Sequence, residues 1–252
     1  MTDSGQAGDF ETDAGHVAAL VRERDRDGYL CALFAPGGRR DALLALLAFN
    51  SEIVRARAGV SEVVIGHMRM KWWYDSLAGV FAGAPPHHPV ARALAGAVPL
   101  GLDRSALEAI IEAHAEAVGG EIDRGADALM RRADAELGPL FRQFLDLLDA
   151  RGPDSDRAVA AAARAWGLLS AMRRASVRPD DVRGVHAAAS DQRRQAGRPR
   201  GAGLPALLPM VLTDIYLGRI ARAGFDLGHP LVRRADPGAW ALPKLWWAAR
   251  RG

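Results

Sequence analysis

Apolar side chains recur at intervals of three and four residues along most of the chain, which is the spacing of amphipathic helices. The pattern is strongest in residues 29–81 and predicts two consecutive helices there. The first is expected to follow a Pro-Gly-Gly turn and to run from about Arg39 to Arg57. Its apolar residues cover much of the helix circumference, so it should be buried on most sides. The second is expected to run to Phe81 from about Ser61, with Ser61 as its N-cap.

Glycine- and proline-rich turns separate the remaining segments with helical periodicity. Thr12 or Asp13 is expected to cap a helix that ends near Gly28, and residues 1–12 are expected to be disordered. Pro139 is expected to kink or split a long helix over 126–150. Residues 176–203 show little periodicity, and they predict a loop or partly ordered segment around one weak helix. The other expected helices cover approximately residues 90–98, 104–118 (ended by Gly119-Gly120), 155–175, 204–223 and 237–251.

This pattern predicts an all-α fold. Alanine and leucine dominate the composition, aromatic residues make up only 6% of the chain, and runs of β-branched residues are scarce. With 252 residues the chain can bury a sizeable core as one domain, or two at most. We expect a single domain over residues 13–252.

The charge balance argues against a nucleic-acid-binding role. Only Lys71 and Lys244 are lysines, so almost all of the 33 basic residues are arginine, a bias that a GC-rich genome also produces. The arginines could attract diphosphates or anionic lipid. However, 30 acidic residues are interspersed among them and the net charge is only +3, whereas a nucleic-acid binder usually has a concentrated basic stripe.

The chain shows no sequence feature of secretion or membrane insertion. Cys31 is the sole cysteine, which excludes an intrachain disulfide and favours a reducing compartment. The polar, acidic N-terminal residues lack the apolar core of a signal peptide, and they are not arginine-rich like a transit peptide. No run of about 18 apolar residues predicts a transmembrane helix. We therefore expect the bacterial cytoplasm.

Motifs for common enzyme chemistries are missing. The sequence has no Gly-x-Ser-x-Gly, no phosphate-binding loop ending in Gly-Lys-Ser/Thr and no Cys-x-x-Cys. The adjacent His87 and His88 would point apart, which favours a loop-surface or helix-capping role over joint metal ligation. Carboxylates four residues apart can bind Mg²⁺ together with a substrate phosphate, although solvated helix faces have the same pattern. Such rows occur at Glu108, Glu112 and Glu116, and at Asp123 and Asp127.

Five motifs together resemble the squalene/phytoene synthase superfamily. They are Arg-Arg-x-Ala-Leu-x-Ala-Leu-x-Ala-Phe at 39–49, Trp-Trp-Tyr-Asp-x-Leu at 72–77, Gly-x-Pro-x-His-x-Pro-Val at 83–90, Tyr-Leu-Gly-Arg at 216–219 and Gly-Phe-Asp at 224–226. The resemblance implies an all-α isoprenoid-synthase-like bundle around a central cavity. Active members condense two isoprenyl diphosphates, and two aspartate-rich motifs hold the Mg²⁺ ions that neutralise the departing diphosphate.

The aligned positions of both aspartate-rich motifs lack aspartate in this chain. In the first they fall on Val54 and Ala58, and in the second on Arg174 and Arg178. Guanidinium groups would repel Mg²⁺ and could bind a phosphate or carboxylate directly. The resemblance therefore implies no catalytic residue and no metal ligand. It does imply a set of candidate residues for binding a ligand in the cavity: Glu52, Arg55, Arg69, Trp72, Trp73, Arg173, Arg174 and Arg178.

A narrower resemblance is to the non-catalytic branch of the superfamily that contains a mitochondrial complex I assembly factor. It rests on Arg-x-Arg-Asp-Gly-Tyr-Leu-Cys at 24–31, Phe-Asn-Ser-Glu at 49–52 and the Met-Arg-Met-x-Trp sequence at 68–72. It implies a non-enzymatic protein that assists assembly of respiratory complex I, needs no cofactor and holds an isoprenoid or lipid. The alternative is a prenyl-diphosphate transferase whose Mg²⁺ site is rebuilt from the carboxylate rows.

The last predicted helix allows a further reading. Trp240, Trp246 and Trp247 lie there with Arg250 and Arg251, so the helix could lie at a membrane interface. The favoured interpretation is that the tryptophans close the core of the bundle. Under the membrane reading the protein would be peripheral at the inner membrane.

Overall fold

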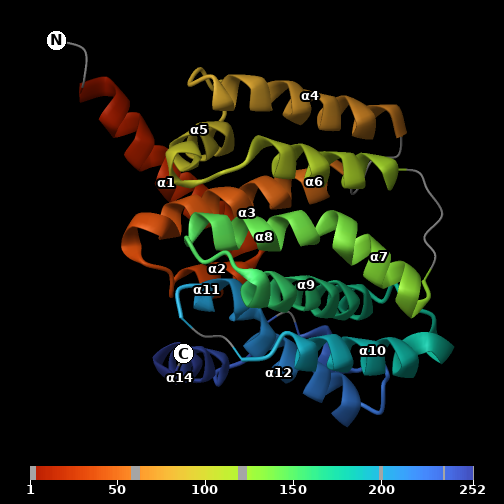
Figure 1. Ribbon diagram of the computed structural model, residues 1–252. Coiled ribbons are helices and arrows are strands. Elements are labelled where there is room, and N and C mark those ends of the chain that lie inside the picture. Colours follow the sequence, from red (N-terminus) through yellow and green to blue (C-terminus); the bar gives the residue numbers. More distant parts are fainter. Residues whose placement is uncertain (1–3, 58–62, 119–123, 199–200, 235, 252) are drawn as a thin grey trace. The chain divides into compact units, whose positions relative to one another are not determined.

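The protein is all-helical, and the part of the chain that the structure describes contains no strand. Figure 1 shows this computed structural model, which describes residues 4–57, 63–118, 124–198, 201–234 and 236–251. The chain forms two compact units, one of residues 1–120 with 146–148 and one of residues 121–145 with 149–252. The all-α prediction is confirmed. The single domain over 13–252 stays a prediction, because two compact units can belong to one domain.

The first unit is built around the buried helix that the hydrophobic pattern predicts. Its helices are α1 (Ser4–Arg24), α2 (Arg26–Ala32), α3 (Gly37–Arg57), α4 (Val63–Phe81), α5 (Pro89–Ala97), the short 3₁₀ helix η1 (Val98–Leu100) and α6 (Arg104–Glu116). Every residue of α3 from Ala42 to Phe49 is buried, so this helix is enclosed on most sides as expected. It packs against α1, α4, α5 and α6, and α4 lies beside α6 (Figure 1).

Two boundaries in this unit differ from the sequence prediction, and others lie outside the described residues. Helix α1 begins at Ser4, earlier than the expected caps at Thr12 or Asp13. It is followed by the separate short helix α2, whose N-cap Asp25 accepts a hydrogen bond from the backbone N–H of Gly28 at 2.9 Å. This capping carboxylate explains the break, because Asp at an N-cap starts a new helix. The proposed cap Ser61 and the stop at Gly119-Gly120 lie outside the described residues.

The second unit contains the remaining helices. They are α7 (Ala126–Glu136), α8 (Gly138–Leu147, whose last residues belong to the first unit), α9 (Pro153–Arg173), η2 (Pro179–Asp181), α10 (Val182–Gln195), α11 (Leu204–Leu207), α12 (Pro209–Arg222), α13 (Pro230–Arg233) and α14 (Ala241–Arg251). The expected split of the long helix at Pro139 is confirmed. Proline lacks a backbone N–H and is tolerated only in the first turn, where α8 places it.

Helix α9 is the packing centre of this unit. It is rich in alanine, and its neighbours α7, α10 and α12 pack against it. The approach to α7 is so close that a Cβ added at Gly167 would lie 2.4 Å from the Cβ of Ala133. A glycine is therefore required at this crossing for steric reasons, since real Cβ atoms do not come that close.

The segment at 176–203 is more regular than the sequence suggests. Helix α10 occupies Val182–Gln195, a full helix rather than a weak one inside a loop. Its buried positions are Val182, Val185, Ala189 and Gln192, which follow helical spacing. The helical period is weak in the sequence because an alanine and a glutamine occupy two of the four inward positions.

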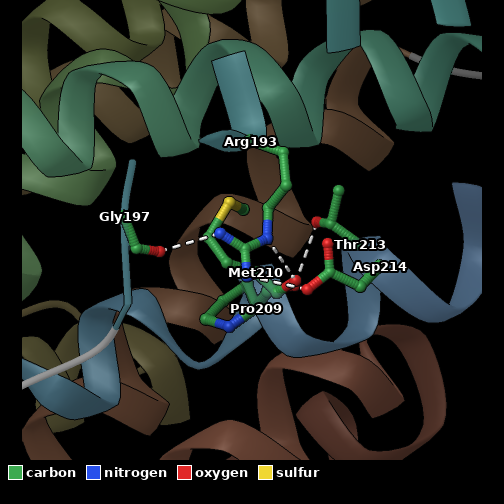
Figure 2. A network of polar contacts seen from close by, with 6 residues as sticks. All are labelled: Arg193, Gly197, Pro209, Met210, Thr213 and Asp214. Atoms are coloured by element: carbon green, nitrogen blue, oxygen red, sulfur yellow. Dashed lines mark hydrogen bonds and ion pairs between the residues drawn. The ribbon is translucent and has the colours of Figure 1, made fainter. Parts of the chain in front are cut away.

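A largely shielded arginine, Arg193, joins α10 to the start of α12 (Figure 2). The Arg193 guanidinium donates to the carbonyl oxygens of Met210 at 3.0 Å and Gly197 at 2.8 Å. Its third donor meets a carboxylate oxygen of Asp214 at 2.7 Å. In the same turn the Thr213 hydroxyl donates to the carbonyl of Pro209 at 3.0 Å. The Arg193 side chain on α10 thus contacts Gly197, just after α10, and Met210, at the start of α12.

The segment Leu204–Arg222, which spans α11 and α12, is long and apolar enough to cross a membrane by length and composition. However, 67% of its apolar window is buried inside the protein, where it packs against α9 and α10. We interpret it as a core segment of the second unit.

Candidate functional site

The position of the first metal-binding motif lies at the C-terminal end of α3. Ile53 and Ala56 point into the core, whereas Val54 and Arg55 are exposed. Ala58 lies outside the described residues. Of the two aligned positions, α3 thus turns Val54 outward, with the cationic Arg55 beside it.

The one carboxylate of this motif, Glu52, is already paired. The guanidinium of Arg24, the last residue of α1, donates a hydrogen bond to it. Both side chains are largely shielded from solvent, with 29% of Arg24 and 19% of Glu52 exposed. Arg24 belongs to the run at 24–31 that carries the narrower resemblance, but its pairing with Glu52 was not predicted.

An aromatic cluster lies beside Glu52 and consists of Phe49, Trp72, Trp73 and His88. The Trp73 ring centroid lies 5.3 Å from Phe49, 4.9 Å from Trp72 and 5.2 Å from His88, all in edge-to-face geometry. Such pairs stabilise beyond the burial of their area. Trp73 is buried, while 43% of Trp72 remains exposed, so the cluster runs from the core of the first unit to its surface.

His88, like Phe49, is a member of this cluster that the sequence did not single out as a binding residue. Burial lowers its pKa below the usual value, although the nearby Glu52 carboxylate acts in the opposite direction. Its Nδ1 atom is buried and has no hydrogen-bond partner among the described residues. His88 occupies the N-cap position of α5, but its side chain makes no capping hydrogen bond. The expected capping role is therefore wrong for the side chain, because the ring packs against Trp72 and Trp73 instead.

A second ion pair lies on the same unit. Two nitrogens of Arg92 on α5 donate hydrogen bonds to the carboxylate of the buried Asp13 on α1, Nε at 2.5 Å and Nη2 at 2.6 Å. Its third nitrogen, Nη1, lies 2.8 Å from Nδ1 of His87. The hydrogen bond with Arg92 holds the pKa of the Asp13 carboxyl below its usual value. The two adjacent histidines thus diverge as expected, one toward Arg92 and the other into the aromatic cluster.

Of the predicted residues of the first unit, Trp72 and Trp73 pack together, and the charge of Glu52 acts on His88 in the same cluster. Arg55 and Arg69 are exposed on α3 and α4 respectively. Near Arg69, Lys71 pairs with Asp75 on the outward side of α4 at 2.9 Å.

In the second unit, Arg173 lies at the end of α9 and stacks on a buried tyrosine. Its guanidinium carbon is 3.9 Å from the ring centroid of Tyr216, and that of Arg219 is 5.4 Å from the same ring. Tyr216 is only 2% exposed, so this arrangement lies at the edge of the core. Arg174 and Arg178 are exposed, and Arg178 pairs with Asp181 at 2.7 Å. That these three arginines line a ligand cavity stays a prediction.

The carboxylate rows required by the transferase alternative are dispersed. Glu108 pairs with Arg104 at 2.7 Å, while Glu112 and Glu116 are exposed. Asp127 is exposed as well, and Asp123 lies outside the described residues. Within the described ranges, no group of three or more His, Cys, Asp or Glu side chains is placed to hold a metal ion.

Comparison with known proteins gives one family and one fold. The family model for squalene/phytoene synthase matches residues 21–184. Among curated proteins, complex I assembly factor 6 from Bos taurus and from Homo sapiens are each 27% identical over 254 residues, covering 86% of this chain and 76% of theirs. The Drosophila melanogaster homologue of that factor is 43% identical over 65 residues, which cover 25% of this chain and 20% of the homologue.

Solved structures confirm the predicted fold. A dehydrosqualene synthase matches with a TM-score of 0.78 and 12% identity, covering 96% of both chains. The squalene synthase HpnC from Alicyclobacillus acidocaldarius matches with a TM-score of 0.71 and 15% identity, covering 86% of this chain and 96% of that one. At such low identity the likeness shows the shared architecture only. The expected resemblance to this family, including homologues named complex I assembly factor, is confirmed.

Proposed function

The chain belongs to the squalene/phytoene synthase family, and we propose that within this family it acts as a non-enzymatic factor in the assembly of respiratory complex I. The observation that carries the proposal is the similarity to complex I assembly factor 6 over 86% of the chain. That similarity extends through both compact units, so it is not a match to a single shared motif.

The chemistry of the first motif supports a role without diphosphate ionisation. The family reaction needs clustered carboxylates, because Mg²⁺ must neutralise a departing diphosphate in an apolar pocket. Here Val54 and Arg55 occupy the outward positions, and Glu52 is bound by Arg24. A carboxylate that already accepts a charge-assisted hydrogen bond is a weaker ligand for a divalent cation.

The proposal includes a ligand with an apolar body and an anionic head group, that is, an isoprenoid diphosphate or a lipid. Arg173, Arg174 and Arg178 of the second unit supply guanidinium groups that suit the phosphate oxygens of such a head group. Binding in the absence of Mg²⁺ would distinguish this role from the enzymatic one. We place the protein in the bacterial cytoplasm, peripheral at the inner membrane, where complex I subunits would be its partners.

Deletion of the gene tests the proposal. We expect the deletion strain to contain less assembled complex I on native gels and to lose NADH:ubiquinone activity, and we expect the intact chain to restore both. The matched control is the level of another respiratory complex, which should not change. Normal complex I content in the deletion strain would refute the proposed role.

A prenyltransferase assay tests the alternative. Purified protein is incubated with farnesyl or geranylgeranyl diphosphate and Mg²⁺, and released diphosphate is measured. We expect no release, since the described carboxylates are not gathered around a metal site. Mg²⁺-dependent release that is lost in Glu108→Gln or Glu112→Gln would instead support a transferase with a rearranged site.

A further inference from the structure

Helix α14 carries an outward apolar surface that the core does not use. Its buried residues are Ala241 and Leu245, which face the unit where α14 packs beside α12 (Figure 1). The exposed fractions are 75% for Trp240, 50% for Leu242, 50% for Trp246 and 53% for Trp247. The interpretation that these tryptophans close the bundle core is therefore wrong. In helical register, Trp246 and Trp247 lie on either side of the direction opposite Ala241 and Leu245.

The same surface is cationic. Lys244, Arg250 and Arg251 lie on α14, and the helix has no acidic residue. The Arg250 guanidinium lies 4.1 Å from the Trp246 ring, and the Arg251 guanidinium lies 3.5 Å from the Trp247 ring. Each exposed tryptophan on this helix is thus stacked with a guanidinium group.

We propose that α14 is a membrane-contact surface that binds a bilayer containing anionic phospholipids, with Trp246 and Trp247 at the head-group level. Indole rings favour the boundary between hydrocarbon and head groups, because one side of the ring is apolar and its N–H can hydrogen-bond. Guanidinium groups beside them suit phosphate oxygens. The chain is then peripheral, since eleven residues lie along a surface and are too few to cross it.

Charge complementarity favours lipid over a protein partner as the occupant. Helix α14 presents three cations, exposed indole rings and no carboxylate that would set a register with a protein partner, whereas these features complement a negatively charged lipid surface. A fluid anionic surface needs no such register. The inference rests on α14 alone, so it stands or falls independently of the proposed role in complex I assembly.

Vesicle co-sedimentation of the full chain tests the proposal. The vesicles contain either phosphatidylcholine alone or phosphatidylcholine with phosphatidylglycerol. We expect binding to the phosphatidylglycerol vesicles, weak binding to phosphatidylcholine alone, and a marked loss of binding at 1 M salt, where the screening length falls to about 3 Å. Replacing Arg250 and Arg251 together with glutamine should weaken partitioning by about fivefold for each charge removed. Trp246→Ser with Trp247→Ser should weaken it by roughly tenfold or more.

Matched variants separate surface chemistry from unfolding. Met68→Ser removes an exposed apolar side chain from α4, 66% exposed, and Arg131→Gln removes an exposed arginine from α7. Both should bind vesicles like the wild type, and all variants should keep the far-UV circular dichroism of the wild type. The proposal is overturned if the wild-type chain sediments with neither kind of vesicle, which would leave protein contact as the use of this surface. It is also overturned if the tryptophan and arginine variants bind as well as the wild type.

Discussion

Replacing Arg193 with methionine should destabilise the second unit by about 2–4 kcal/mol. Methionine keeps the length and apolar stem of the side chain but removes all three donors. The guanidinium gives hydrogen bonds to the carbonyls of Met210 and Gly197 and an ion pair to Asp214. Only 16% of the arginine side chain is exposed, so its donors are largely shielded from water.

The magnitude follows from the exposure of each partner. A hydrogen bond from a charged donor contributes about 1.5–3 kcal/mol when shielded, and the Met210 carbonyl belongs to a fully buried residue. The bond to the exposed Gly197 should contribute less. Asp214 is 56% exposed, so its ion pair should contribute about 0.2–1 kcal/mol. The two backbone contacts therefore account for most of the effect.

Urea unfolding followed by circular dichroism measures the change, with hydrogen exchange of α10 to localise it. Arg193→Lys should lose nearly as much stability as Arg193→Met, since one ammonium cannot reach three acceptors in a fixed fork. Asp214→Asn should cost at most about 1 kcal/mol. The matched control is Arg194→Met, because the neighbouring arginine is 71% exposed and pairs only at the surface with Asp191.

Two results would refute the reasoning. If Arg193→Met is as stable as the Arg194→Met control, the backbone contacts contribute nothing measurable. If Asp214→Asn costs as much as Arg193→Met, the exposed ion pair rather than the carbonyl contacts holds α10 to α12.

Three further outcomes are expected. Gly167→Ala should lower the unfolding midpoint, because overpacking costs about 1–3 kcal/mol and exceeds the gain in helix propensity. The control Gly218→Ala on α12, where the glycine has open space around it, should be neutral or stabilising. Equal midpoints for the two variants would contradict the close crossing of α7 and α9. The pKa of the Asp13 carboxyl is depressed in the folded protein, so its ion pair stabilises the fold above the unfolded-state pKa of about 3.9, and this stability is lost as pH falls through the folded-state pKa. The loss of unfolding free energy in Arg92→Met, measured by urea unfolding, should therefore shrink as pH falls below about 4. A loss that does not depend on pH would argue against the ion pair. Burial raises the pKa of the Cys31 thiol, so a thiol reagent at pH 8 should label it only after unfolding, and rapid labelling of the native protein would contradict that burial.

The sequence predicted most of the fold because the strongest helices bury large apolar residues at regular spacing. Leu46, Phe49 and Ile53 define the buried faces of α3 without any knowledge of the tertiary structure. Helix α10 was underestimated because Ala189 and Gln192 occupy inward positions, and small or polar residues leave no hydrophobic signal. The exposure of Trp246 was mispredicted, because a tryptophan at helical spacing looks the same whether it faces the core or the solvent.

The composition of the candidate site stays a prediction, whereas the side-chain pairs of the first unit could not be predicted from the sequence. The sequence shows that Val54, Ala58, Arg174 and Arg178 stand at the aligned motif positions, and that this removes metal binding stays a prediction. The contact of Arg24 with Glu52, and that of Arg92 with Asp13, joins residues far apart in the chain, and no local pattern encodes such distances. The low polarity around His88 likewise depends on Trp72 and Trp73 from another helix.

The scarcity of lysine has a practical consequence for labelling chemistry. Each compact unit carries one lysine, Lys71 on α4 of the first and Lys244 on α14 of the second, and both are exposed. Apart from the terminal amine, an amine-reactive reagent therefore has a single target in each unit. A bifunctional reagent that joins the two lysines would yield one defined product. The length of its spacer would then give an upper limit for the distance between Lys71 on α4 and Lys244 on α14.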